Sequence, residues 1–349
     1  MQEKIVNKIS PLQVNRDKAE LSKPGDVNLV KYLNQKHLEL KKEVGKAIIG
    51  YENIIDLIII AILSRGHCLL VGVPGLAKTL LVKTLSEVLE LKFSRIQFTP
   101  DLMPSDIIGT EIIEEDLTIG SKSFKFVKGP IFANMILSDE INRTPPKTQS
   151  ALLEAMQEHK VTAAGTTYIL DEPFYVLATQ NPIEHEGTYP LPEAQLDRFM
   201  FNVWLDYPSM SEESDIIKYT TSMYTPKLNI VLKKEEIISL QDLVRKVPVS
   251  ENVIKFTVSL VNKTRPTNDN SPKYIKDWIS WGAGPRASQY LILGAKTNAI
   301  LDGRFTPEID DIKKVATPVL RHRLITNFNA EADNVKTTDI IDKLILEIV

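Results

Sequence analysis

The chain has 349 residues, of which 43% are hydrophobic and 25% are charged, so it is long enough to bury one large core or two smaller ones. Its formal net charge is -3 and its pI is about 6.1. This balance gives no electrostatic reason to expect nucleic acid or an anionic membrane as the main partner. A single cysteine, Cys68, excludes a disulfide within one chain.

The first residues have too short an apolar core for a secretory signal, and one cysteine fits a reducing compartment. The most hydrophobic segment, Ile54–Leu63, contains Asp56 and is too short to cross a bilayer. We therefore expect a cytoplasmic protein without membrane insertion, and a buried helix at this segment.

Residues 1–40 are polar and predict an N-terminal extension, helical around Val27–Leu40. Over residues 41–208, short apolar runs alternate with helical stretches, which is typical of a parallel sheet covered on both faces. The predicted strands are His67–Val71, Phe93–Phe98, Met135–Ser138, Phe174–Thr179 and Phe199–Leu205.

Two hairpins are predicted as insertions into this α/β core. Thr110–Lys128 has an acidic first half, a Gly120-Ser121 turn and a basic second half, so its strands are expected to pair by charge. Lys160–Leu170 repeats the pattern around Gly165.

After Pro208 the periodicity becomes helical, which predicts a second, all-helical domain over residues 209–349. Its predicted helices are Ser209–Thr220, Lys234–Val244, Ser250–Thr264, Arg286–Leu301 and Pro307–Leu320.

Residues 72–79 read GVPGLAKT, between a predicted strand and a predicted helix at Lys78–Leu89. This context is typical of a phosphate-binding loop, in which backbone amides and a helix N-terminus surround an anion. Gly72 and Gly75 leave room for the phosphates, Lys78 reaches the β- and γ-phosphates, and Thr79 is a magnesium ligand. Ala77 replaces the usual glycine, which is tolerable if its dihedral angles are helical.

Asp139 and Glu140 follow the apolar run Met135–Ser138, and Asn181 follows the run Phe174–Thr179. We expect Asp139 to hold magnesium, Glu140 to polarise the attacking water, and Asn181 to orient that water. Arg143 is open to pairing with the segment around Glu140 or with a neighbouring subunit.

Arg198 lies just before the last predicted strand, in EAQLDRF. We expect it to act as an arginine finger on the nucleotide of a neighbouring subunit, the alternative being a structural pairing with Asp197 or Glu193. Arg286, in GPRA at a helix start, is a candidate sensor of the γ-phosphate, in its own subunit or across an interface.

These segments resemble the MoxR family of AAA+ ATPases over residues 41–349. Besides the loop, the resemblance rests on IQFTPDLMPSDIIG (96–109), GPIFANMILSDEINRTPPKTQSALLEAMQE (129–158), ATQNPIEHEGTYPLPEAQLDRF (178–199), GPRASQYLILGA (284–295) and VLRHRL (319–324). It implies a core with a five-stranded parallel sheet, a helical lid, and ATP and Mg²⁺ as cofactors. Ala77 matches the family's own variant, and Tyr51 stands where a glutamine is common.

The resemblance further implies a ring, usually hexameric, that remodels or matures protein clients, including metal insertion. Such clients are often von Willebrand factor A domain proteins. The nucleotide-binding residues it implies are Ile49, Gly50, Gly72, Val73, Pro74, Gly75, Leu76, Ala77, Lys78, Thr79 and Leu80.

Two other functions stay open. A nucleic-acid motor related to MCM helicases predicts basic hairpin tips, but Glu114, Glu115 and Asp116 offset the lysines of the first hairpin. The other is a nucleotide-gated scaffold with little hydrolysis, and the presence of Glu140 and Arg198 argues against it.

Overall fold

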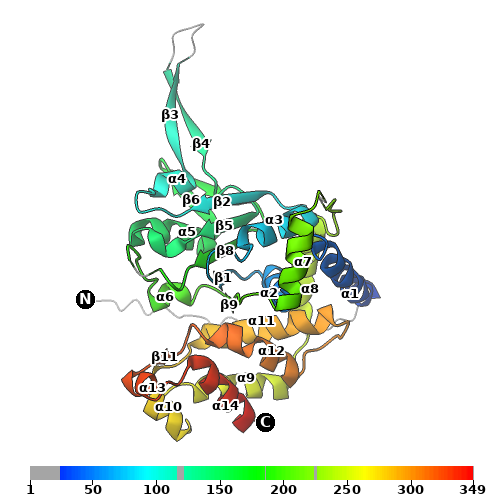
Figure 1. Cartoon of the computed structure of the whole chain (residues 1–349), viewed down its shortest axis with the longest axis vertical. Coiled ribbons are helices and arrows are strands. Elements are labelled where there is room, and N and C mark those ends of the chain that lie inside the picture. Colours follow the sequence, from blue (N-terminus) through cyan, green and yellow to red (C-terminus); the bar gives the residue numbers. More distant parts are fainter. Residues whose placement is uncertain (1–23, 116–121, 185, 224–225, 349) are drawn as a thin grey trace, which may run out of the picture.

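The computed structural model describes residues 24–115, 122–184, 186–223 and 226–348. An α/β layer rests on a helical layer, and a long hairpin stands out from the opposite end (Figure 1). The helices are α1 Pro24–Val44, α2 Glu52–Leu63, α3 Lys78–Val88, α4 Pro104–Ile108, the short 3₁₀ helix η1 Ile141–Arg143, α5 Pro146–Glu158, α6 Glu193–Leu196, α7 Met210–Thr220, α8 Lys234–Lys246, α9 Glu251–Lys263, α10 Lys273–Trp278, α11 Pro285–Leu301, α12 Ile309–Leu320, α13 Phe328–Ala332 and α14 Thr337–Ile348. The strands are β1 Cys68–Val71, β2 Phe93–Gln97, β3 Gly109–Glu115, β4 Lys122–Lys128, β5 Met135–Asp139, β6 Lys160–Ala163, β7 Thr166–Ile169, β8 Tyr175–Gln180, β9 Phe201–Trp204, β10 Ile279–Trp281 and β11 Ile325–Thr326.

The central sheet has five strands in the order β2-β5-β8-β1-β9, and all of its neighbouring strands run parallel. The predicted five-stranded parallel sheet is therefore confirmed, and the predicted strands differ from the observed ones only at their ends. Because parallel strands bring their carboxyl ends to one edge, the segments after β1, β5 and β8 meet there. That edge is where a ligand of such a sheet binds.

Both faces of the sheet are covered by apolar side chains. One buried cluster includes Leu69, Ile136 and Leu153, on the side of α5. The other includes Ile58 and Leu291, and it continues without interruption from the sheet into the helices after residue 209. The helical part therefore packs directly on the α/β part through a shared core.

The two inserted hairpins are β3–β4 and β6–β7, each an antiparallel pair. The turn predicted at Gly120-Ser121 lies outside the described residues. The strands of the first hairpin do pair by charge: Glu115 lies opposite Lys122, and Lys125 Nζ lies 3.0 Å from Glu114 Oε1. Gly165 has φ 77° at the second turn, a left-handed conformation that favours glycine.

The predicted extension over residues 1–40 divides at Pro24. Residues before it lie outside the described part, whereas α1 runs through the predicted boundary and buries Val30, Leu33 and Leu40 in the main cluster. The weak periodicity of this segment did not predict its burial, because only a few large aliphatic side chains anchor the helix to the core.

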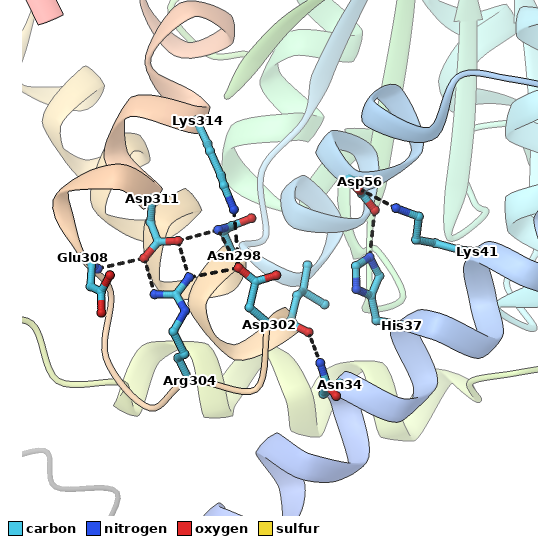
Figure 2. A network of polar contacts seen from close by, with 11 residues as sticks. Asn34, His37, Lys41, Asp56, Asn298, Asp302, Arg304, Glu308, Asp311 and Lys314 are labelled. Atoms are coloured by element: carbon cyan, nitrogen blue, oxygen red, sulfur yellow. Dashed lines mark hydrogen bonds and ion pairs between the residues drawn. The ribbon is translucent and has the colours of Figure 1, made fainter. Parts of the chain in front are cut away.

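Polar contacts also tie α1 to the rest of the chain, as Figure 2 shows. Asp56 of α2 accepts from His37 Nε2 at 2.8 Å and from Lys41 Nζ at 2.9 Å. Asn34 Nδ2 donates to the Leu301 carbonyl at 2.6 Å, which joins α1 to the end of α11 (Figure 2). Nearby, Asp311, which is almost fully buried, accepts two hydrogen bonds from Arg304. The helix α1 thus contacts both parts of the molecule.

Among the described residues, no helix combines the length and the apolar character needed to cross a membrane.

Candidate functional site

The loop at residues 72–77 connects β1 to α3 at the carboxyl edge of the sheet. Gly75 has φ 88°, and a methyl group there would meet no atom within 4 Å, so the loop is open at this point. The amides of Gly75, Leu76 and Ala77 make no hydrogen bond to any described residue. Free amides beside a helix N-terminus fit the phosphates of a nucleotide.

At Gly72, a side chain would be too close to the chain that follows β9. A Cβ at this position would lie 3.0 Å from Leu205 Cβ and 3.1 Å from the Leu205 carbonyl oxygen. The absence of a side chain therefore lets the loop pack against the chain that follows β9.

Ala77 adopts the left-handed conformation, with φ 53° and ψ 24°, at the N-cap of α3. The condition that its dihedral angles be those of an ordinary right-handed helix is therefore not met. An alanine in this conformation costs about 1–2 kcal/mol. Strain of this kind concentrates at functional sites.

Replacing Ala77 with glycine is expected to raise the free energy of unfolding by about 0.5–1 kcal/mol, because the relieved strain exceeds the added chain entropy. Chemical denaturation measures this change. Ala332→Gly, at an exposed helical alanine in α13, is the matched control and should lower stability by a similar amount. A less stable Ala77→Gly protein would contradict the assignment of strain.

Lys78 is the first residue of α3, and its Nζ donates to the Gly72 carbonyl across the loop. Burial lowers the pKa of this lysine, although the negative charges of Asp139, Glu140 and Glu184 act in the opposite direction. A half-buried ammonium held over open amides suits an anionic ligand. Thr79 follows it in the first turn, partly exposed.

Asp139 ends β5, and both of its carboxylate oxygens are held. Thr179 Oγ1 donates to Oδ1 at 2.6 Å, and Arg95 Nη2 donates to Oδ2 at 2.6 Å. Sequence reasoning missed Arg95 and Thr179. The polar positions Arg95 and Gln97 alternate along β2 in FSRIQF, and this pattern beside a predicted strand ending in carboxylates was the available signal.

Glu140 is turned away from Asp139 by a left-handed backbone conformation, with φ 56°. Its amide donates to Thr179 Oγ1 at 2.9 Å. Its Oε2 accepts from Gln97 Nε2 at 3.1 Å and from Arg143 Nη1 at 3.2 Å. Arg143 therefore pairs within its own chain. Although Asp139 and Glu140 are adjacent in sequence, their carboxylates have different hydrogen-bond partners, so they can serve different roles in the site.

Asn181 follows β8 and is 5% exposed. Its Oδ1 accepts from the Ile183 amide at 3.3 Å, but its buried Nδ2 makes no hydrogen bond to any described residue. A buried donor without an acceptor is costly, and it suits a site that a polar ligand completes.

A cleft of about 690 Å³ lies between the chain before α2 and the chain after β9, and Ile49, Gly50 and Tyr51 are among its lining residues. Leu205, which packs against Gly72 of the loop, lies between two other lining residues, Trp204 and Asp206. The size of the cleft suits a nucleoside. Gly50 has φ 73°, a left-handed conformation that favours glycine, and a Cβ there would also force the Glu212 carboxylate, 2.5 Å away, to move. The Tyr51 hydroxyl donates to the Asp206 carbonyl at 3.3 Å. Tyr51 therefore joins the residues before α2 to those after β9.

Arg198 and Arg286 line a different cavity, of about 190 Å³, together with Arg65 and His159. No residue of the phosphate-binding loop lines it. Arg198 forms no ion pair with any described residue, so the alternative of pairing with Asp197 or Glu193 is not realised. In Figure 1, α6, just before Arg198, and α7, which borders the 690 Å³ cleft, lie on opposite sides of the sheet.

Asp197 links the arginines around this second cavity. Its Oδ2 accepts from Arg286 at 3.0 Å, and its Oδ1 accepts from Arg323 Nε at 2.7 Å. Arg323 is 6% exposed and also donates to the carbonyls of Phe199 and Met200. The segment that carries Arg198 is therefore clamped to the helical part. Only the motif VLRHRL marked Arg323 in the sequence.

Arg323→Met is expected to lower the free energy of unfolding by about 3 kcal/mol, because it removes the donor to buried carbonyls and to Oδ1 of Asp197. Urea unfolding provides the measurement. Arg321→Met is the control: Arg321 lies over the Trp204 ring at 5.6 Å, and losing that contact should cost under about 1 kcal/mol. Equal losses in the two proteins would argue against the clamp.

Comparison with known proteins is consistent with this geometry. Residues 67–201 match the ATPase family associated with various cellular activities (AAA), and residues 273–344 match the AAA lid domain. Chaperone MoxR1 of Mycobacterium tuberculosis is 43% identical over 303 residues, which cover 87% of this chain and 79% of that protein. Protein MoxR of Methylorubrum extorquens is 28% identical over 313 residues, covering 86% and 91%. The crystal structure of a protein assigned as an ATPase from Cytophaga hutchinsonii superposes with a TM-score of 0.86 at 44% identity, covering 92% of this chain and 96% of that one.

Proposed function

We propose that this chain, which belongs to the MoxR family of AAA+ ATPases and hydrolyses ATP, works as a ring of identical subunits that remodels protein clients. The proposal of a ring is supported by the separation of two groups of site residues within one chain. The loop, Asp139 and Asn181 lie at the carboxyl ends of β1, β5 and β8, whereas Arg198 precedes β9 at the opposite edge of this parallel sheet. There Arg198 and Arg286 share a cavity with His67, which precedes β1.

Within one subunit, the residues around the loop suffice to bind the nucleotide and to activate water. The open amides and Lys78 bind the phosphates, and Glu140 accepts a proton from the attacking water. Asn181 orients that water with its unpaired amide group. Magnesium, when bound through Thr79 and Asp139, would neutralise charge on the phosphates.

The second half of the site is proposed to come from a neighbour. Arg198, which has no carboxylate partner among the described residues, stabilises the charge that develops on the γ-phosphate of the adjacent subunit. Arg286 lines the same cavity and is held by Asp197, the residue next to Arg198 in sequence. If one arginine acts in trans, then the other does too, and Arg286 reads the nucleotide across the interface.

The clients are proposed to be proteins, among them von Willebrand factor A domain proteins, and the work done on them includes maturation by metal insertion. The name Chaperone MoxR1 of a 43% identical relative supports a chaperone role. The protruding β3–β4 hairpin exposes Ile113 and Phe124 by 63% and 75%, which gives a surface for apolar segments of a client (Figure 1).

Measuring the mass of the chain in solution tests the ring, with and without ATP and magnesium. We expect a shift from small species to a closed assembly, six subunits by our proposal, when nucleotide is present. A chain that stays monomeric with nucleotide bound would refute this function. A client trapped on a ring that binds ATP without hydrolysing it, and recovered by affinity capture, would identify the partner.

A further inference from the structure

The helix α7 exposes an apolar face that nothing in the described chain covers. None of its residues is buried. Met210, Glu213 and Ile217 follow each other at the spacing of one helical face, and Met210 and Ile217 are 87% and 55% exposed. Ser209 caps the helix through Glu212, so the segment is well ordered as a helix although it lacks a core side. A helix of this kind is a candidate for contact with another molecule.

The face is acidic as well as apolar. Glu213 is exposed and forms no ion pair with any described residue. Glu212 and Asp215 lie in the same helix, and its one cation, Lys218, is paired with Asp215 at 2.7 Å. A surface that accepts α7 should therefore combine apolar side chains with unpaired cations.

Such a surface exists elsewhere on the molecule, as a groove of about 1,020 Å³ between the end of α8, α9 and α11. Val249, Ile254, Val258 and Ile292 are among its lining residues, and Ile254 and Val258 are 39% and 45% exposed. An α-helix with the 11 residues of α7 is roughly 16 Å long, and a groove of this volume can hold one side of it.

The groove also holds cations that have no carboxylate. Among the described residues, neither Arg245 nor Lys296 forms an ion pair, and Lys296 Nζ donates only to the Arg245 carbonyl, at 3.3 Å. Burial lowers the pKa of Lys296, and the neighbouring Arg245 lowers it further. Two adjacent cations beside apolar side chains favour an incoming carboxylate.

We propose that this groove binds α7 of a second copy of the chain, with Met210 and Ile217 on the apolar floor and Glu213 between Arg245 and Lys296. The proposal rests on the ring described above and names the contact that closes it. It is a head-to-tail interface, in which each copy offers a helix on one side and a groove on the other.

The position of the two halves of the proposed ATP site supports α7 of a second copy as the occupant of the groove. Arg286 lines the groove and also the cavity that contains Arg198. On the other side of the molecule, Glu212 of α7 lines the nucleotide cleft. When the arginines of one copy approach the nucleotide of the next copy, the groove of the first copy therefore approaches α7 of the next copy. A single interface then contains both contacts: arginines with nucleotide, and groove with α7.

Disulfide cross-linking tests the contact directly. The chain has one cysteine, Cys68, which is buried, and burial raises its pKa to about 12, so it should not react. Ile217→Cys combined with Val258→Cys should give, on oxidation with ATP and magnesium present, a ladder of covalent dimers, trimers and larger species on a non-reducing gel. A mixture of the two single variants should stop at dimers, and each single variant alone should stay monomeric.

A charge exchange provides a second readout that does not depend on thiol geometry. Glu213→Arg and Arg245→Glu should each weaken nucleotide-dependent assembly about tenfold, and the double variant should recover most of it. Glu331→Arg, the same charge change at an exposed residue of α13, should leave assembly unchanged.

The outcomes separate this interface from the ring itself. A ring that forms and hydrolyses ATP, but neither cross-links nor responds to the exchange, overturns the interface and leaves the proposed function standing. Dimers from Ile217→Cys alone indicate a symmetric contact and overturn it as well. A chain that never assembles overturns both.

Discussion

Glu140→Gln is expected to retain ATP binding while turnover falls about 10²–10⁴-fold, the usual contribution of a positioned general base. The residue lies outside the phosphate-binding loop, so the amides and Lys78 remain available to the nucleotide. The amide of glutamine can still accept from Gln97 and Arg143, which hold the carboxylate at 3.1 Å and 3.2 Å. The change therefore removes the proton acceptor and leaves its position intact.

Phosphate release under saturating Mg–ATP measures the turnover of this variant, and titration with a fluorescent nucleotide measures its affinity. Glu154→Gln is the matched control, because Glu154 is an exposed glutamate of α5 that forms no ion pair with any described residue. Turnover of that control should stay within a few-fold of the parent. Unchanged turnover in Glu140→Gln would remove Glu140 from its proposed role.

Much of the fold followed from the sequence because local signals agreed with one another. The alternation of apolar runs and helices predicted the parallel sheet, and the loop between β1 and α3 located its binding edge. Five helices after residue 209 (α7, α8, α9, α11 and α12) were predicted from their periodicity and from caps such as Ser209, whereas α13 and α14 were not predicted. The strands β10 and β11 were missed, because two- and three-residue strands carry no period.

Contacts between distant segments were beyond sequence reasoning. Arg95 reaches Asp139 across β2 and β5, and Arg323 reaches Asp197 from the helical part, at sequence separations of 44 and 126. The alternating polar positions of β2 and the VLRHRL motif mark these arginines, but nothing local identifies Asp139 or Asp197 as the partner. The left-handed backbone at Ala77 was missed for a related reason: the residue type argued against it, and the geometry of the loop prevailed.

Arg198→Ala is expected to lower turnover about 10³-fold or more in a ring that still assembles, because an arginine finger stabilises charge that exists only in the transition state. Its guanidinium has no ion-pair partner among the described residues, so its removal leaves no carboxylate unpaired. Folding and mass should therefore stay close to those of the parent.

Mixing subunits decides whether the arginine acts on its own nucleotide or on a neighbour's. Lys78→Ala and Arg198→Ala should each be inactive alone. In a mixed ring of equal parts, about a quarter of the interfaces join an intact loop from one variant to an intact arginine from the other, so activity should return to that fraction. If Arg198 served its own loop, then every subunit in the mixture would lack one of the two groups and no activity would return. Recovery therefore requires that catalysis occurs between subunits, which is why the two groups of residues can lie on opposite sides of one chain.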